Sequence, residues 1–342
     1  MLILNCLICG PIMRIVFVAF DDHLICNFKR VIILYIRIVE SFDMNTSSLE
    51  ELRECLLNRD KNPIAKRTHA AFLLRTNGSV EAASIIAEAL QVREDSSLMR
   101  HELAYILGQM QFDTVCPILE RILDDESEDL IVRHESAEAL GSIGSSTSLQ
   151  LLHKYCKHVS PEIHETCQIA IDLINWKAAD NQPSSTVSSS SGGYLSKDPA
   201  PPINHATTII STNTVEHLRS KLMDSSASLF NRYRAMFALR NMNSDSAALA
   251  LVAGFNDTSA LFRHEIAYVL GQMQRMVTVE ALSMVLRNKN EHAMVRHEAA
   301  EALGAVGGEY AEKVLSEFTT DDVAVVRESC YVALNIMDYW QD

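Results

Sequence analysis

Apolar residues recur every three to four positions along most of this chain, a spacing that predicts amphipathic α-helices. In residues 98–110, the apolar side chains that would share one face of such a helix are Leu103, Ile106, Leu107 and Met110. Shorter apolar stretches, such as residues 116–123 and 279–286, lie between the longer segments. The pattern therefore predicts an all-α chain built of paired helices.

The helical segments are copies of one another at two fixed intervals. Residues 98–110 (LMRHELAYILGQM) match residues 261–273 (LFRHEIAYVLGQM), and residues 131–144 (IVRHESAEALGSIG) match residues 294–307 (MVRHEAAEALGAVG). The histidines of these segments are 33 residues apart within each half (134 − 101 and 297 − 264) and 163 apart between the halves (264 − 101 and 297 − 134). A period in the low thirties is typical of stacked helix pairs. The sequence is therefore a duplicated array of helical repeats.

Looser copies flank these segments and extend each half to four units of two helices. The flanking matches are residues 65–75 with 231–240, and residues 162–176 with 325–340. We expect a HEAT-like α-α superhelical solenoid with two pseudo-symmetric halves. Glycines such as Gly108 and Gly144 recur near the ends of the second helices, where a small residue permits close helix contact or a C-cap.

Composition divides the chain into four parts. Residues 177–214 contain SSTVSSSSGGYLSKDPAPP, which is too poor in apolar side chains to order itself. We predict that they form a flexible linker between one module at 44–176 and a second at 215–342. Residues 1–43 do not share the repeat pattern and are interpreted as an N-terminal extension.

The extension is apolar but carries no clear targeting signal. Its first stretch, residues 1–20, is interrupted by Pro11 and Arg14. A signal peptide has a basic start and a small-residue cleavage site, and a membrane span needs about 20 apolar residues with few charges. Upstream translated sequence ahead of Met44 is the favoured interpretation, and a targeting role is the alternative.

Charge and cysteine usage limit the function classes. The net charge of −14 argues against a nucleic-acid binder, because attraction to phosphate requires a basic surface, and it fits a basic protein partner. Cys6 and Cys9 form a Cys-x-x-Cys, but no second pair completes a zinc site. The eight cysteines are scattered and predict buried free thiols of a reducing compartment. We therefore expect a cytoplasmic protein without membrane attachment.

Four Arg-His-Glu triplets lie at equivalent positions of the repeats, at residues 100–102, 133–135, 263–265 and 296–298. Each opens the second helix of its unit, and equivalent helices of a solenoid stack side by side. If the two halves face each other, four imidazoles and several carboxylates converge. Adjacent residues on a helix point about 100° apart, so each His-Glu pair would serve two ions, or one ion and a substrate. Imidazole and carboxylate without thiolate favour non-haem iron or manganese over structural zinc.

Structural roles are the alternative for each of these residues. A single His-Glu at a helix start is more often a cap or surface pair than a ligand, but repeat inheritance does not explain four ionisable pairs on inner helices. The arginines are interpreted as framework residues that stack or pair with carboxylates. A fifth pair, His164-Glu165, has Arg327 in place of its histidine in the other half, so it is set aside. Tyr105 and Tyr268 are expected to line the site or to pack beside it.

The chain resembles the deoxyhypusine hydroxylase family in its RHELAY-LGQM and RHE-AEALG-IG runs and in their double spacing. The resemblance covers residues 47–176 and 214–342. It implies an iron-dependent monooxygenase that hydroxylates the deoxyhypusine side chain of translation initiation factor 5A to hypusine. It also implies molecular oxygen as co-substrate and two Fe(2+) ions per chain. The metal-site residues that it implies are His101, Glu102, His134, Glu135, His264, Glu265, His297 and Glu298.

The resemblance further implies that each iron takes two histidines from one half and a carboxylate from the other. One ion is then assigned to His101, His134 and Glu265, and the second to His264, His297 and Glu102. Glu135 and Glu298 are expected to be outer ligands or anchors for the cationic substrate side chain. No catalytic residue beyond these ligands is predicted.

Two other classes of function compete with this interpretation. The fold alone favours a non-catalytic HEAT-repeat interaction scaffold, which would bind no metal. A HEAT-like lyase or a metal-storage module would use the same histidines without a translation-factor partner. Bound metal would separate the scaffold from the other two.

Overall fold

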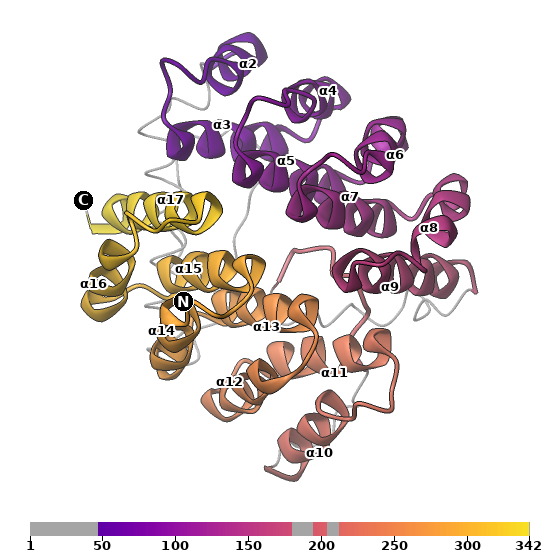
Figure 1. The fold of residues 1–342 in the computed structure, drawn as a ribbon, viewed down its shortest axis with the longest axis vertical. Helices are drawn as coiled ribbons and strands as arrows, with labels where there is room; N and C mark the ends of the chain where they lie inside the picture. Colours follow the sequence, from indigo (N-terminus) through magenta and orange to yellow (C-terminus); the bar gives the residue numbers. More distant parts are fainter. Residues whose placement is uncertain (1–46, 180–193, 204–211, 342) are drawn as a thin grey trace, which may run out of the picture. The chain divides into compact units, whose positions relative to one another are not determined.

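The chain is helical through most of the residues that a computed structural model describes, which are 47–179, 194–203 and 212–341. Within these ranges there are sixteen α-helices, α2 to α17, and no strand (Figure 1). The repeats form one compact unit, Ser48–Asp338. The predicted all-α fold is confirmed, while the predicted extension at residues 1–43 lies outside the described residues.

Eight helix pairs follow one another, four in each half, as the sequence predicts (Figure 1). The outer helices are α2 (Leu49–Leu57), α4 (Val80–Leu90), α6 (Cys116–Asp124), α8 (Leu149–Tyr155), α10 (Thr212–Leu222), α12 (Asp245–Val252), α14 (Val279–Arg287) and α16 (Glu309–Glu317). The inner helices are α3 (Ile64–Asn77), α5 (Ser97–Met110), α7 (Leu130–Ile143), α9 (Pro161–Ala178), α11 (Leu229–Met242), α13 (Ala260–Met273), α15 (Ala293–Val306) and α17 (Ala324–Gln341). Short 3-10 turns flank some outer helices, at Asp113–Val115, Ser146–Ser148, Ala253–Asn256 and Met276–Thr278.

The first described helix, α2, begins at a capping motif. Ser48 is the N-cap of α2, and its hydroxyl accepts a hydrogen bond of 3.2 Å from the backbone N–H of Glu51. The Glu51 carboxylate accepts one of 2.6 Å from the backbone N–H of Ser48. This reciprocal pair is a capping box, which satisfies two N–H groups that have no partner within the helix.

Glycine–alanine contacts bring successive inner helices close together. A Cβ added to Gly108 of α5 would lie 2.8 Å from the Cα of Ala139 on α7, and a Cβ on Gly271 of α13 would lie 3.0 Å from the Cα of Ala302 on α15. Gly144 instead ends α7 in the left-handed conformation, with φ at 84°. The glycines therefore have both predicted roles, close helix contact and helix C-capping. Their close contacts hold neighbouring inner helices at the separation on which the site depends.

The arginines of the triplets connect successive helices, as the framework interpretation predicts. Arg100 donates from Nε to the carbonyl of Leu90 at the end of the preceding outer helix, over 2.9 Å, and its Nη1 lies 2.6 Å from Glu128. Arg296 repeats this arrangement with Leu286, over 3.0 Å, and with Asp321. A helix C-terminus has carbonyl groups without partners, and a cation stabilises them. The arginines thus fix the stacking of the repeats.

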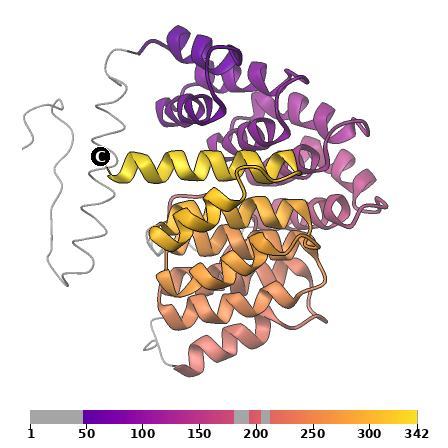
Figure 2. The same cartoon turned by 60° about the vertical axis from the view of Figure 1, so that its left-hand side comes forward.

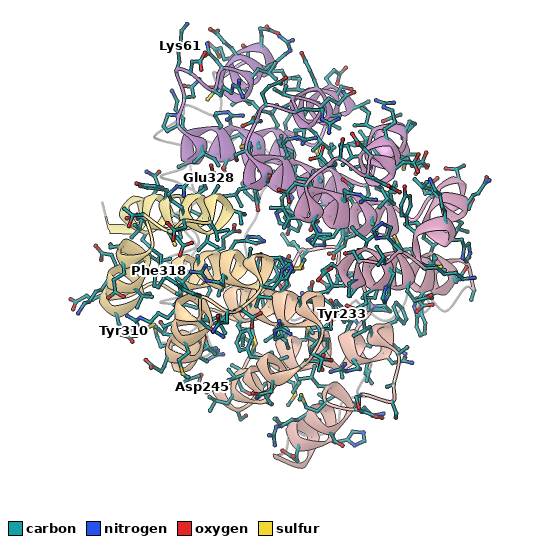
Figure 3. The ribbon with its side chains drawn as sticks, in the orientation of Figure 1. Lys61, Tyr233, Asp245, Tyr310, Phe318 and Glu328 are labelled. Atoms are coloured by element: carbon teal, nitrogen blue, oxygen red, sulfur yellow. The ribbon has the colours of Figure 1, made fainter. Side chains whose placement is uncertain are left out.

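The two halves meet along α9 and α17. Helix α9 packs against α11 and α13, and Figure 2 shows α17 between the helices of the two halves. Ser259, the N-cap of α13, donates a hydrogen bond of 2.6 Å to Glu165 of α9. Glu328 of α17 has the equivalent partner, Ser96, at the N-cap of α5, and Figure 3 labels Glu328 on this junction. Equivalent serine–glutamate contacts therefore join the halves at both places.

Part of the interval predicted to be a linker lies among the described residues. Helix α9 continues to Ala178 and α10 begins at Thr212, so helices occupy both ends of the interval 177–214. Residues 194–203 form no helix, but they hydrogen bond with both halves of the repeat array. Composition predicts low order for this interval, yet a short part of it finds partners on the helices.

Most of the described cysteines are buried, as the sequence predicts, but one of them is not. Cysteines 55, 116, 167 and 330 are buried free thiols, whereas Cys156 is only half-buried, which corrects the prediction that it belongs to the core. It follows the short helix α8 at the edge of the repeat, where less of the side chain is covered. None of the described helices combines the length and the apolar character needed to cross a membrane.

Candidate metal centre

The four histidines of the triplets occupy the same register on four inner helices. His101, His134, His264 and His297 are each the fifth residue of α5, α7, α13 and α15. Their exposed fractions lie between 0 and 5%. The N-caps that start these helices set the register, since Ser96, Asp129, Ser259 and His292 each accept a hydrogen bond from a backbone N–H of the first turn. Equivalent caps thus place equivalent imidazoles.

The imidazole rings converge from both halves, as the sequence predicts. The ring centroids of His101 and His134 are 5.6 Å apart, and those of His264 and His297 are 5.4 Å apart. Across the halves, His101 lies 5.1 Å from His297, and His134 lies 5.2 Å from His264. The four imidazoles of the two halves therefore form one cluster of neighbouring rings.

The glutamates of the triplets approach these rings in an equivalent way in both halves. Glu135 Oε2 lies 3.3 Å from His101 Nε2, and Glu298 Oε2 lies 3.4 Å from His264 Nε2. Glu102 Oε1 lies 3.3 Å from His101 Nδ1. Each half thus brings a carboxylate from its second triplet to the histidine of its first.

Three sets of side chains have donor atoms within 4.8 Å of one another and could hold a metal ion. The sets are His101 with His134 and His264, His264 with His297 and Glu298, and His134 with Glu135 and Glu138. None of the three pairs Glu265 or Glu102 with histidines of the opposite half. The division of carboxylates implied by the family resemblance therefore stays a prediction.

Several buried donor atoms of the cluster have no hydrogen-bond partner among the described residues. They are both ring nitrogens of His134 and His264, Nε2 of His101 and His297, and Oε1 of Glu265. An unsatisfied buried polar atom costs about 1–3 kcal/mol, so such a concentration destabilises the fold unless something else binds these atoms. A bound cation would accept one lone pair from each neutral imidazole and one from the carboxylate oxygen of Glu265. The residues present therefore fit a metal centre.

The imidazoles of the cluster differ in their tendency to bind protons. Burial lowers the pKa of three of them well below the usual value, and neighbouring imidazoles lower it further; these are His134, His264 and His297. Burial also lowers the pKa of His101, but the carboxylates of Glu102 and Glu135 beside the ring outweigh it and leave this pKa well above its usual value. Three rings therefore present neutral nitrogen, the form that binds metal.

The carboxylates of the cluster repel one another. Burial raises the pKa of Glu265 and Glu298 well above the usual value, and nearby carboxylates raise it further. Glu138 and Glu301 are affected in the same direction, mainly by burial. A group of buried acids with raised pKa values gains from a cation among them, because the cation offsets their mutual repulsion.

Sequence reasoning missed two glutamates of this site. Glu138 and Glu301 lie three residues after Glu135 and Glu298, on the same helix faces, and both line the cavity. Ser329 of α17 donates a hydrogen bond of 2.9 Å to Glu301. The signal that would have found them is the 163-residue interval, which relates Glu138 to Glu301 as it relates the triplets.

The cluster opens into a cavity of about 330 Å³. Acidic residues and histidines line one part of it, and the hydroxyls of Tyr105 and Tyr268 meet in its wall at 2.9 Å. Phe72 of α3 and Val332 and Ile336 of α17 line another part, and Ile336 is 44% exposed. The cavity therefore joins an acidic end to an apolar end. The tyrosines line the site, which decides between the two roles expected for them.

The fifth His-Glu pair lies elsewhere. His164 Nδ1 is 3.2 Å from the carbonyl of His158, and Glu165 binds Ser259 at the junction of the halves. Neither residue lines the cavity. The symmetry argument that sets this pair aside thus agrees with the geometry.

The fold consists of stacked helix pairs in two equivalent halves, and a buried histidine–glutamate cluster lies between the halves. These features define a HEAT-repeat protein with a candidate metal-binding site. Residues 86–171 and 249–335 match the family of HEAT repeats.

Comparison with individual proteins identifies the family more closely. The chain is 44% identical over 311 residues to deoxyhypusine hydroxylase of Candida albicans, which covers 88% of this chain and 95% of the relative. It is 43% identical over 280 residues to the Homo sapiens deoxyhypusine hydroxylase, with coverage of 82% and 88%. A solved structure of human deoxyhypusine hydroxylase in complex with glycerol superposes with a TM-score of 0.78 at 41% identity, covering 88% of this chain and 99% of that one. The chain belongs to the deoxyhypusine hydroxylase family, so it is an enzyme and not a non-catalytic scaffold.

Proposed function

We propose that this protein hydroxylates the deoxyhypusine side chain of translation initiation factor 5A to hypusine, with molecular oxygen as co-substrate. The observation that carries the proposal is the convergence of four buried imidazoles from two halves, with ring nitrogens that have no hydrogen-bond partner among the described residues. A cytoplasmic location follows from a substrate that works in translation.

The eight histidines and glutamates of the triplets would form the site of two Fe(2+) ions. In the arrangement that we favour, His101, His134 and Glu265 hold one ion, and His264, His297 and Glu102 hold the other. Imidazole and carboxylate donors without thiolate suit non-haem iron. The bound metal supplies the oxygen-activating redox chemistry, which no side chain of the chain provides.

The protein's own residues bind and orient the substrate. Its side chain is a long amine that carries positive charge, and the acidic end of the cavity attracts it. Glu135 and Glu298 would accept hydrogen bonds from its amino groups, helped by Glu138 and Glu301 nearby. The apolar end, formed by residues such as Phe72, would pack against the methylene groups of the chain. Burial of the cluster keeps bulk water away from the reacting carbon.

Mass spectrometry of the substrate tests this function. Incubation of the iron-loaded full chain with deoxyhypusine-bearing factor and isotopically labelled dioxygen should add one labelled oxygen atom to the modified side chain. The same factor with an unmodified lysine should stay unchanged, because it lacks the second amine. A deoxyhypusine factor that gains no oxygen from iron-loaded enzyme would rule the proposal out.

A further inference from the structure

Residues 194–203, here called the strap, hydrogen bond to the N-terminal half through one residue. The backbone N–H of Lys197 donates to Gln109 Oε1 of α5 over 2.7 Å, and Gln109 Nε2 donates back to the carbonyl of Lys197 over 3.1 Å. Ser142 of α7 donates to the same carbonyl over 3.3 Å. A reciprocal amide pair fixes both the position and the direction of the strap at this point.

The strap is bound to the C-terminal half by a buried ion pair. Asp198 accepts two hydrogen bonds from Arg240 of α11, of 2.7 and 2.6 Å, and Arg240 is 1% exposed. The guanidinium also lies 4.5 Å from the centre of the Tyr194 ring. Further along, the backbone N–H of Ile203 donates to the carbonyl of Arg234 over 3.1 Å. A bidentate pair of this kind is among the strongest polar contacts in proteins.

A chain of hydrogen bonds leads from the strap to the wall of the cavity. Gln272 of α13 accepts from Arg240 over 2.8 Å and donates to Ser196 over 3.1 Å. It also donates to the hydroxyl of Tyr268 over 2.8 Å, and that hydroxyl meets the one of Tyr105 across the halves. Gln272 thus connects the strap to the pair of tyrosines.

The two glutamines that hold the strap are equivalent residues of the repeat array. Gln109 and Gln272 are 163 residues apart and belong to the LGQM runs of the two halves. Each lies on an inner helix that also carries one of the site histidines, eight residues earlier, at His101 and His264. One strap therefore connects the two helices that bring the metal-type cluster together from opposite halves.

We propose that the strap is a clasp that holds the two halves of the cluster in register, and that Gln272 is a positioning residue that passes this constraint to Tyr268 and Tyr105. A centre assembled from two halves needs a fixed separation between them, since a displacement of about 1 Å can cost 100-fold in rate. The strap supplies a direct link across that separation. The expected effect of the strap on turnover rests on the function proposed above, but the hydrogen-bonded connection between the halves does not.

Removal of either contact at the C-terminal half tests the clasp. Asp198→Asn leaves Arg240 buried without its partner charge, whereas Gln272→Leu removes the hydrogen bonds at similar volume and leaves no unpaired charge. The control is Asp245→Asn on α12 of the same half, which removes an exposed ion pair with Arg275; Figure 3 labels Asp245.

The first measurement needs neither metal nor substrate. Spin labels on unnatural amino acids at Glu54 and Lys313, exposed positions in opposite halves, report the distance distribution between the halves in the metal-free full chain. We expect a narrow distribution in the parent and the control and a broader one in both strap variants. If Asp198→Asn does not fold, Gln109→Leu decides, because it removes the reciprocal pair with Lys197 that holds the strap to the N-terminal half. A distribution as narrow as that of the parent in folded Asp198→Asn or folded Gln109→Leu overturns the clasp.

Steady-state kinetics of the iron-loaded proteins then test the positioning role. We expect kcat of Gln272→Leu to fall by about 10–100-fold, with KM within a factor of about two, because Gln272 lines the cavity but carries no charge that would bind the amines of the substrate. An unchanged kcat beside a broadened distribution overturns the positioning role. An inactive parent would refute the proposed function and leave the distance result standing.

Discussion

Replacement of His101 by alanine is expected to lower hydroxylation by at least about 100-fold, the upper end of the effect of losing an outer partner of a metal ligand. The ring has its Nε2 buried among three other imidazoles and a carboxylate. Alanine offers no donor atom in its place, so the centre loses a ligand and the iron that it would hold. Turnover of the deoxyhypusine-bearing factor is the measurement.

The chain supplies a matched control for this substitution. His164→Ala removes a histidine that also precedes a glutamate, but it lies on α9 outside the cavity lining, and its Nδ1 is 3.2 Å from the nearby carbonyl of His158. We expect His164→Ala to keep its activity within a factor of about two, with less than about 0.5 kcal/mol change in stability. Equal loss of activity in both variants would mean that the triplets are not the reactive centre.

Replacement of Asp321 by alanine is expected to destabilise the fold by about 3–5 kcal/mol, because it leaves the charge of Arg296 buried and unpaired. The two side chains are each 3% exposed, and Arg296 donates to both carboxylate oxygens, over 3.3 and 2.6 Å. Denaturant unfolding measures the change. The exposed pair of Arg287 and Glu317 is the control, and Glu317→Ala should cost less than about 1 kcal/mol.

The contribution of Asp321 to the free energy of unfolding should also depend on pH. Burial raises the pKa of this carboxyl, but the hydrogen bonds from Arg296 and from the backbone N–H of Val323 outweigh it, so the folded pKa lies below the usual value. A lowered folded pKa gives stability that is fully present above the unfolded pKa of about 3.9 and is lost as the pH falls through the folded pKa. The difference between parent and Asp321→Ala should therefore shrink below about pH 4. A difference that stays constant down to pH 2 would contradict this account of the pair.

The repeat architecture could be predicted because each of its determinants is local and duplicated. The 3.6-residue apolar period sets the helices, Ser48 with Glu51 sets the first cap, and Gly108 sets a close contact between inner helices. The convergence of the histidines could also be predicted, since the repeat places His101 and its equivalents at one register. In a strict duplication, the fixed interval between the copies shows which residues occupy equivalent positions on their helices. A single motif does not show this.

Other features depend on contacts between residues far apart in the sequence, so the sequence pattern indicates them only weakly. The strap lies in a stretch whose composition predicts disorder, and its contacts involve partners such as Arg240, which is 42 residues away from Asp198. Glu165 belongs to a His-Glu pair that is evident in the sequence. Its serine partner, however, lies in the other half of the chain, so the sequence pattern does not indicate their contact. The division of carboxylates between ions depends on side-chain rotamers, because neighbouring residues on a helix diverge by about 100°.

The central claim is that the two halves together form a metal centre for two iron ions. Quantitative metal analysis of the anaerobically purified full chain tests it most directly. The account predicts about two irons per chain in the parent and a loss of iron in the alanine variant of any of the four clustered histidines. A chain that is folded, purified without oxygen and free of iron would contradict it.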